Sequence, residues 1–380
     1  MQEIPKTFCP AKWDELFINF SYNMVYACCK ATPVHFDKDY ESVIRIQQDN
    51  LLNNIKDPSC EYCWKTEGES NSSHRLMYLD LFDSSRFPEY KNGTAKLKQL
   101  QINLGNSCNL QCIYCNPKFS SKWENDVKFK KYPIVSDRFN YEILKKNKDL
   151  TDQNLNFLSK FEDLEIINIS GGEPLYNNRF FELLDYAKAD VLSFVTNLNV
   201  DRSVIDKLLT YKNKFKKIKI GCSIDAVDSA ATFLRHGIDI DLFYDNLNYL
   251  LSKKDTGLEI SIQTLMTNIS VVDIENTIPK FLDMVNKYKI TWRLYYCKTP
   301  RILSFESLNE YVRDELKTQF NKLTDNEYIT GAEVVIGALQ NVRFDKGIFK
   351  EFEYFLKEWQ ERKQVSIPEH IKERLYAQTK

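Results

Sequence analysis

The residues best suited to chemistry are three closely spaced cysteines, Cys108, Cys112 and Cys115. They follow the apolar run 100–104 and the turn-prone segment 105–107. A closed structural zinc site needs four ligands, and this loop offers three cysteines with no histidine nearby, so simple zinc binding fits the spacing poorly. Three thiolates can instead bind three irons of a 4Fe-4S cubane and leave the fourth iron open to another ligand.

A second motif follows another apolar run, residues 165–170, which ends in Gly171, Gly172, Glu173 and Pro174. Glycines let the backbone approach a ligand closely, and Gly172 with Glu173 can offer polar groups to a ligand ammonium. Alone, this pattern also describes an ordinary strand-to-helix turn. Its position after the cysteine loop, with an apolar strand before each motif, favours a functional role.

Together the two motifs resemble those of the radical S-adenosylmethionine (SAM) superfamily. In that family the open iron chelates the amino and carboxylate groups of SAM, and an electron from the cluster cleaves SAM to a 5'-deoxyadenosyl radical. An aromatic residue before the last cysteine, here Tyr114, is also typical. The resemblance implies an enzyme that binds SAM at Cys108, Cys112 and Cys115.

The chain from residue 96 alternates apolar strands with helical segments. The expected strands are 100–104, 165–170, 192–197, 218–224, 258–265 and 290–296. The expected helices between them include 178–189, 201–211 and 272–288. This alternation predicts an α/β fold with parallel strands. With the resemblance, we expect a partial (β/α)6 TIM-like barrel whose ligands bind at the carboxyl ends of the strands.

We expect three regions along the chain. Residues 1–95 form a cysteine-rich module, residues 96–297 the radical SAM core, and residues 298–380 a mostly helical extension. Within the core, residues 116–163 form an enlarged region rich in lysine and aromatic residues. We expect a solvated helical insertion there, and a lid or partner-binding segment is the alternative.

Polar residues stand where the expected strands end: Thr196, Asn197, Ser223, Asp225 and Arg235. Hydroxyl, amide and carboxylate groups suit the ribose of SAM, and Arg235 suits its carboxylate. In the family, a Thr-Asn pair and a Ser-x-Asp triplet at these places commonly contact SAM. The alternative is that these residues cap the strand-to-helix junctions.

Five further cysteines fall within the first 63 residues: Cys9, Cys28, Cys29, Cys60 and Cys63. Two short apolar runs around the turn 21–23 predict a hairpin that brings Cys9 toward the Cys28-Cys29 pair. A cysteine pair beside Cys-x2-Cys is a strong metal signal. Four thiolates complete either a zinc site or a cubane, and the spacing does not distinguish these metals.

This region resembles the cysteine-rich module of SPASM and twitch proteins, which are radical SAM enzymes with auxiliary clusters. The resemblance rests on Cys9-Pro10 with Trp13, the Cys28-Cys29 pair, Cys60-x2-Cys63-Trp64 with Glu67, and Ser73-His74-Arg75. It implies a second 4Fe-4S cluster held by Cys9, one of Cys28 and Cys29, Cys60 and Cys63. Structural zinc and unliganded thiols are the alternatives. The module precedes the barrel here, and the hairpin turn lacks the usual glycine.

Cys297 ends the last expected strand after residues 292–296. It is our candidate catalytic residue, because a thiol facing the barrel cavity can donate a hydrogen atom or bind metal. A buried, inert cysteine is the commoner alternative.

The composition limits the partners. With 52 Lys plus Arg against 53 Asp plus Glu, the formal net charge is -1, which does not favour nucleic acid or an anionic membrane. No apolar run approaches 18 residues and no secretory signal pattern begins the sequence, so we expect a cytoplasmic protein. Ten cysteines in that compartment indicate metal or redox chemistry before disulfides.

We therefore predict a radical SAM enzyme that abstracts hydrogen from a substrate. The resemblance implies a peptide or protein side chain as substrate, and an electron donor such as flavodoxin or ferredoxin as partner. A twitch-type dehydrogenase or rearrangement enzyme acting on a small metabolite is one alternative. A non-catalytic metal-binding partner protein is an alternative of another class.

Overall fold

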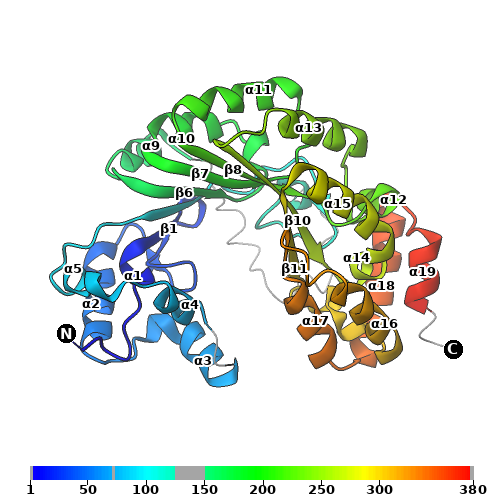
Figure 1. Cartoon of the computed structure of the whole chain (residues 1–380), viewed down its shortest axis with the longest axis horizontal. Coiled ribbons are helices and arrows are strands. Elements are labelled where there is room, and N and C mark those ends of the chain that lie inside the picture. Colours follow the sequence, from blue (N-terminus) through cyan, green and yellow to red (C-terminus); the bar gives the residue numbers. More distant parts are fainter. Residues whose placement is uncertain (1–2, 71–72, 125–149, 377–380) are drawn as a thin grey trace. The chain divides into compact units, whose positions relative to one another are not determined.

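The computed structural model describes residues 3–70, 73–124 and 150–376 (Figure 1). It is a mixed α/β structure whose strands pair largely in parallel. The chain divides into two compact units. The first takes the described residues of 1–105, 141–171 and 178–193, and the second takes those of 106–140, 172–177 and 194–380.

The sheet of the first unit is built around β1 (Glu15–Asn19). It pairs antiparallel with β2 (Met24–Tyr26), which pairs antiparallel with β3 (Val34–His35). On its other edge β1 pairs in parallel with β4 (Gln99–Asn103), and β4 pairs in parallel with β6 (Leu164–Ser170). The expected N-terminal hairpin is therefore confirmed, and it belongs to the same sheet as the first two expected core strands.

The turn of this hairpin does not need a glycine. A short 3-10 helix, Phe20–Tyr22, leads into Asn23, which has a φ of 57°. Asparagine tolerates this left-handed conformation better than most residues do. The turn can therefore keep its geometry although the usual glycine is replaced.

Figure 1 shows the helices of the blue and cyan part of the chain grouped near β1. The helices of the first unit are α1 (Ala11–Asp14), α2 (Tyr40–Leu52), α3 (Glu61–Ser70), α4 (His74–Asp80), α5 (Phe87–Lys91), α9 (Asp152–Leu158) and α10 (Phe180–Tyr186). The apolar core among residues 4–95 centres on Phe8, whose ring contacts Trp13, Phe87 and Tyr90. Buried Cys9, Cys28 and Cys60 belong to the same apolar cluster, so packing of this core places the thiols.

The strand β7 (Ala189–Thr196) begins in the first unit and ends in the second. The second unit then carries four strands in the parallel order β8-β10-β11-β12. They are β8 (Lys217–Ser223), β10 (Leu258–Met266), β11 (Thr291–Tyr296) and β12 (Ile329–Thr330). The six strands expected from the sequence are all present near their predicted positions. Parallel strands buried on both faces read as apolar runs, which is why the sequence marks them clearly.

Helices alternate with these strands and continue to the end of the described chain. They are α6 (Ser121–Glu124), α11 (Arg202–Thr210), α12 (Asp228–Leu234), α13 (Ile240–Ser252), α14 (Asn268–Val272), α15 (Ile274–Tyr288), α16 (Glu310–Asn321), α17 (Ala332–Asn341), α18 (Lys346–Lys363) and α19 (Glu369–Tyr376). After β11 the described chain carries α16 to α19, and it also adds β12 to the sheet. A strand of two residues is too short to show a pattern in the sequence.

The compact units do not follow the three consecutive regions expected from the sequence, because β1 pairs with β4 and both lie in the first unit. The regions 1–95, 96–297 and 298–380 stay a prediction about domain organisation. In the enlarged region 116–163, residues 125–149 lie outside the described residues, and the flanking parts carry α6 and α9. None of the described helices combines the length and apolar character that crossing a bilayer requires.

Candidate functional site

The cysteine loop is held by backbone pairing within the second unit. Two residues of the loop form β5 (Gln111–Cys112), which pairs antiparallel with β9 (Arg235–His236) and sets Cys112 opposite Arg235. The next residue, Ile113, donates its N–H to the carbonyl oxygen of Leu234 at 2.8 Å. The segment that carries the thiols is therefore fixed to the chain more than 100 residues later.

The three thiols of this loop share one environment. Cys108 is buried, and Cys112 and Cys115 are partly buried. Burial raises the pKa of Cys108 to about 12, with a smaller contribution from Cys112, and burial likewise raises the pKa values of Cys112 and Cys115. Negative charge on Cys112 or Cys108 would raise the pKa of Cys115 further. The thiols thus stay neutral until a cationic group stands among them.

The spacing of the sulfurs fits a cluster better than a single ion. Within the described parts of the chain, one set of three potential metal ligands has all its ligand atoms within 4.8 Å of one another, and that set is Glu15, Cys29 and His74. The sulfurs of Cys108, Cys112 and Cys115 are therefore not all within 4.8 Å of one another. A cubane binds each thiolate to a different iron, so this donor set fits a 4Fe-4S cluster.

The two glycines of the second motif allow close backbone packing. Both have positive φ, 92° at Gly171 and 49° at Gly172. A side chain on Gly171 would meet the carbonyl oxygen of Gly105 at 2.6 Å, and one on Gly172 would meet the carbonyl of Ser107. From the sequence we expected these glycines to let the backbone approach a ligand closely. In the structure the two glycines pack closely against the backbone of residues 105–107, just before Cys108.

Glu173 follows with a carboxylate that is 2% exposed. One oxygen accepts hydrogen bonds from the Thr196 hydroxyl at 2.6 Å and the Leu175 N–H at 3.0 Å, and the other accepts from the Asn197 N–H at 2.6 Å. Burial nevertheless raises the pKa of Glu173 to about 7, although these hydrogen bonds oppose the shift. A carboxylate offers about four acceptor positions, so one remains for a ligand donor.

Asn197 ties this carboxylate to the cysteine loop. Its side-chain amide donates to the side-chain oxygen of Asn109 at 2.8 Å, and Asn109 donates to the carbonyl oxygen of Asn199 at 2.5 Å. The predicted Thr-Asn pair therefore lies beside the predicted Glu173. Its observed contacts are with the protein, and contact with SAM stays a prediction.

Asp225 forms the centre of a second buried network. It is 0% exposed and accepts hydrogen bonds from the Tyr114 hydroxyl at 2.6 Å and the Leu265 N–H at 2.9 Å. Arg235 lies against both carboxylate oxygens, at 2.8 Å through Nε and 3.1 Å through Nη2, and also donates to the Ser223 hydroxyl at 2.6 Å. The network joins four predicted residues, Tyr114, Ser223, Asp225 and Arg235.

Three hydrogen bonds already reach the two oxygens of Asp225, and Nε of Arg235 lies beside one of these oxygens as an ion pair. Burial disfavours the charged form of Arg235, but its pKa is raised because Asp225 and other anionic groups stabilise it. The geometry makes Asp225 the partner of the guanidinium that we expected to meet the SAM carboxylate. Contact of Asp225 or Arg235 with SAM stays a prediction.

The remaining predicted residues of the core are Pro174 and Cys297. Pro174 begins a short 3-10 helix, Pro174–Tyr176, whose N-terminus is capped by Glu173. Cys297 is 2% exposed, its thiol lies 3.5 Å from the carbonyl oxygen of Thr299, and burial raises its pKa to about 12. A role in hydrogen transfer stays a prediction for this thiol.

The sequence did not reveal how α18 supports the cysteine loop. Lys363 of this helix donates to the side-chain oxygen of Gln111 at 2.7 Å, and Trp359 stacks on Trp123 with ring centroids 5.5 Å apart. The indole of Trp123 in turn donates to the carbonyl oxygen of Cys112 at 3.2 Å. The aromatic content of α18 was visible in the sequence, but its partner 252 residues away was not.

In the first unit the structure separates Cys28 from Cys29. Cys9, Cys28, Cys60 and Cys63 are buried, and electrostatic repulsion links Cys9 with each of the other three. Cys29 is exposed, and its sulfur lies 3.6 Å from Nε2 of His74. Cys28 thus belongs with the buried thiols, whereas Cys29 lies beside His74.

The buried Lys12 was also missed by the sequence reasoning. Its ammonium donates to Gln47 at 2.9 Å and to Ser59 at 2.8 Å, and the residue is 1% exposed. Burial raises the pKa of Cys28 to about 12, and the charge of Lys12 opposes that shift. A cation therefore stands beside the N-terminal thiols.

The other motif residues of this unit hold the thiol-bearing segments together. Arg75 makes a bidentate pair with Glu67, at 2.9 and 2.6 Å, and donates to the carbonyl oxygen of Phe8 at 3.2 Å. Its guanidinium also lies 4.8 Å from the ring centroid of Trp64. Through these contacts Arg75 joins the segment before Cys9 to the helix that carries Cys63.

Comparison with known proteins gives the family. Residues 102–279 match the model of the radical SAM superfamily, and this segment contains the cysteine loop, Glu173, Asp225 and Arg235. The protein is a radical SAM enzyme. The thiols of its cysteine loop and its glycine-rich motif therefore occupy the part of the chain on which the family match rests.

Individual relatives of this radical SAM enzyme are distant. "Uncharacterized protein MJ0907" of Methanocaldococcus jannaschii is 24% identical over 239 residues, which cover 60% of this chain and 70% of the relative. Among solved structures, histidine-tagged anSMEcpe with bound AdoMet has 19% identity and a TM-score of 0.42. Native anSMEcpe with bound AdoMet and Cp18Cys peptide has 18% identity and a TM-score of 0.40. Each of these two structural matches covers 59% of this chain and 59% of the solved chain.

Proposed function

We propose that this enzyme holds a 4Fe-4S cluster on Cys108, Cys112 and Cys115, binds SAM there, and abstracts hydrogen from a substrate. The observation that carries the proposal is the group of three buried or partly buried thiols on one loop that is fixed by pairing with β9. When bound, the cluster and SAM supply the reductive cleavage that yields the 5'-deoxyadenosyl radical.

The protein's own residues would bind and orient SAM. Glu173 keeps one acceptor position, which suits the ammonium of SAM. Thr196 and Asn197 hold the carboxylate of Glu173 in place through hydrogen bonds. The Asp225–Arg235 pair anchors the cysteine loop, because the Tyr114 hydroxyl of that loop donates to Asp225. A buried, ordered site also keeps water away from a reactive intermediate.

The partial (β/α)6 barrel, spanning residues 96–297, is our proposal for the scaffold of this site. The parallel order of β8, β10 and β11, with helices between them, supports it. We assign a second 4Fe-4S cluster to Cys9, Cys28, Cys60 and Cys63. In a zinc site the sulfurs would lie about 3.8 Å apart, and no three of these sulfurs lie within 4.8 Å of one another in the described structure.

The direct test is 5'-deoxyadenosine formation by anaerobically reconstituted, chemically reduced protein. Replacing Cys108, Cys112 and Cys115 by Ala should abolish it, because SAM would lose its cluster. Cys222→Ala is the matched control, since Cys222 is a fully buried thiol on β8 outside both thiol groups. Unchanged formation in the triple variant would refute the assignment.

For the substrate we propose a peptide or protein side chain, with a small metabolite as the alternative, and for the reductant a flavodoxin- or ferredoxin-type donor. Deuterium transfer separates the two substrate classes. Transfer from a deuterated peptide library into 5'-deoxyadenosine supports the proposal. Transfer only from a deuterated small-metabolite extract assigns the alternative.

A further inference from the structure

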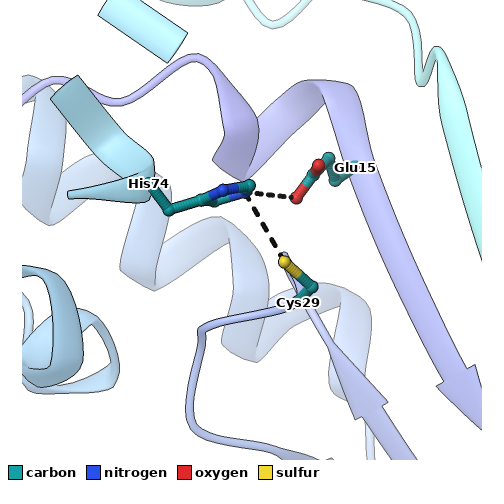
Figure 2. Close-up of side chains that lie close together, drawn as sticks. All are labelled: Glu15, Cys29 and His74. Carbon is teal, nitrogen blue, oxygen red and sulfur yellow. Dashed lines mark hydrogen bonds and ion pairs between the residues drawn. The ribbon is translucent and has the colours of Figure 1, made fainter. Parts of the chain in front are cut away.

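Three side chains outside the proposed cluster ligands converge in the first unit (Figure 2). Nε2 of His74 lies 3.1 Å from Oε2 of Glu15 and 3.6 Å from the sulfur of Cys29, and all three ligand atoms lie within 4.8 Å of one another. Figure 2 shows the imidazole pointing toward both the carboxylate and the thiol. Carboxylate, imidazole and thiol are the three side-chain types that bind zinc.

Two of these separations match the edges of a metal tetrahedron, and the third, between sulfur and carboxylate, is within 4.8 Å. With Zn–S near 2.3 Å and Zn–N and Zn–O near 2.0 Å, tetrahedral angles place sulfur and nitrogen about 3.5 Å apart and nitrogen and oxygen about 3.3 Å apart. The observed 3.6 and 3.1 Å are close to both values. The three atoms could therefore bind one ion without large rearrangement of the backbone.

Nε2 of His74 faces both the sulfur of Cys29 and the carboxylate of Glu15, and one hydrogen on this nitrogen cannot make a good hydrogen bond to both. Nε2 carries at most one hydrogen, and it must be shared between the sulfur of Cys29 and the carboxylate of Glu15. A metal ion placed among the three would bind all of them at once. It would also offset the charge of Glu15, whose side chain is 6% exposed.

Neighbouring residues hold Glu15 and His74 in place, as the residues that hydrogen-bond to metal ligands do in known metal sites. Tyr78 donates its hydroxyl hydrogen to Oε1 of Glu15, which leaves Oε2 toward His74. Glu15 is fixed on β1 opposite Gln99, and His74 begins α4 after the cap formed by Ser73. Such orienting contacts raise the metal affinity of a site.

We propose that Glu15, Cys29 and His74 form a binding site for a divalent transition-metal ion of the zinc type. The site uses none of the four thiols assigned to the second cluster, and it gives Cys29 a role separate from that of Cys28. Three protein ligands leave a fourth position, and the exposure of Cys29 opens this side to water or to an incoming ligand. Bound metal would tie β1, the segment after β2 and α4 together.

The test uses the full-length, cluster-reconstituted protein with Zn²⁺ as the probe. Bound zinc and iron are measured together after dialysis, and zinc affinity is measured by competition with a chromophoric chelator. We expect wild type to bind one more zinc per chain than His74→Gln, at the same iron content. His35→Gln is the matched control, because His35 is an exposed histidine of the same unit.

Two further measurements keep the proposal testable if His74→Gln folds poorly. Zinc-edge X-ray absorption of the wild type should report one sulfur with nitrogen and oxygen ligands. Tyr78→Phe should weaken zinc binding by roughly 10- to 100-fold, because it removes only the hydroxyl that orients Glu15.

Equal zinc content in wild type and in folded His74→Gln would overturn the proposal, as would a zinc site with three or four sulfurs. Zinc lost on replacing Cys60 and Cys63, but not His74, would assign the metal to the buried thiols instead. That outcome would refute both this site and the second cluster. SAM cleavage at Cys108, Cys112 and Cys115 is measured separately, so its failure would leave this result standing.

Discussion

At the scale of single residues, the most consequential finding is that the buried carboxylate of Asp225 pairs with the buried guanidinium of Arg235. A buried carboxylate facing a buried guanidinium is stable as a pair, but either charge alone is costly in that environment. Arg235 is 4% exposed and Asp225 is 0% exposed. We therefore expect the Asp225–Arg235 pair to stabilise the fold, whether or not either residue also contacts SAM.

We expect Asp225→Asn to lower the free energy of unfolding by about 3–5 kcal/mol, since it leaves the Arg235 charge without a buried partner. Denaturant unfolding of the variant and wild type measures this. Asp228→Asn, on an exposed carboxylate three residues later, is the control. If Asp225 acted only as a SAM contact, SAM affinity would fall while stability stayed unchanged.

Glu173 makes a second residue-scale prediction, about pH. Its pKa is raised to about 7 by burial, so the carboxyl becomes protonated as the pH falls below 7 and can no longer pair with an ammonium. We expect SAM affinity to decrease by up to about tenfold per pH unit below 7. Equilibrium binding at pH 6 to 8 measures the trend.

Glu173→Gln provides the comparison, because it keeps the shape of the side chain but does not titrate. The variant should bind SAM more weakly at pH 8, with little change toward pH 6. A wild-type affinity as flat with pH as that of the variant would mean that other groups hold the ammonium.

At this scale the sequence predicted residue types and positions better than partners. Arg235 was expected to meet the carboxylate of SAM, which stays a prediction, and its pairing with Asp225 was not foreseen. Spacing along the chain could not reveal this, because the partner is chosen by how β9 runs beside β5. Likewise the Cys28-Cys29 pair looked equivalent in sequence, and only folding buries one thiol and exposes the other.

At the scale of elements, long buried strands were predictable and short ones were not. β6 and β10 are apolar runs with turn residues at their ends, so the pattern marks them. β5, β9 and β12 each have two residues, and their pairing depends on distant segments. The support of the cysteine loop by α18 was hidden for the same reason.

That support gives an element-scale prediction. Trp359 is 1% exposed and stacks on Trp123, which donates to the carbonyl oxygen of Cys112. We expect Trp359→Ala to cost about 3–5 kcal/mol of stability and to reduce the iron retained at the Cys108 loop. Unfolding and iron content after gel filtration measure the two effects.

Tyr354→Ala is the control, because Tyr354 lies on the same helix and is 55% exposed. It should leave both quantities close to wild type. Full iron retention in a destabilised Trp359→Ala would mean that α18 stabilises the unit without positioning the loop.

At the scale of the whole molecule, the chain carries two separate groups of thiols, each placed by its own unit. Cys108, Cys112 and Cys115 belong to the second unit, and the buried N-terminal cysteines belong to the first. The sequence divided the chain at residue 95, whereas the compact units interleave. Parallel pairing of β1 with β4 accounts for the difference, since it joins segments about 80 residues apart that no local pattern connects.

The last prediction follows from this separation of the two thiol groups. In the variant with Cys108, Cys112 and Cys115 replaced by Ala, Cys9, Cys28, Cys60 and Cys63 should still hold the iron, sulfide and visible absorption of one cubane. Four thiolates with no open iron suit electron transfer, and the nearby Lys12 charge offsets part of the cluster's negative charge. Adding Cys60→Ala should remove this iron, whereas adding Cys29→Ala should not, because Cys29 is exposed and contacts His74. A colourless protein whose zinc disappears with Cys60→Ala would make the N-terminal thiols a structural zinc site, and electron transfer through the first unit would have to be abandoned.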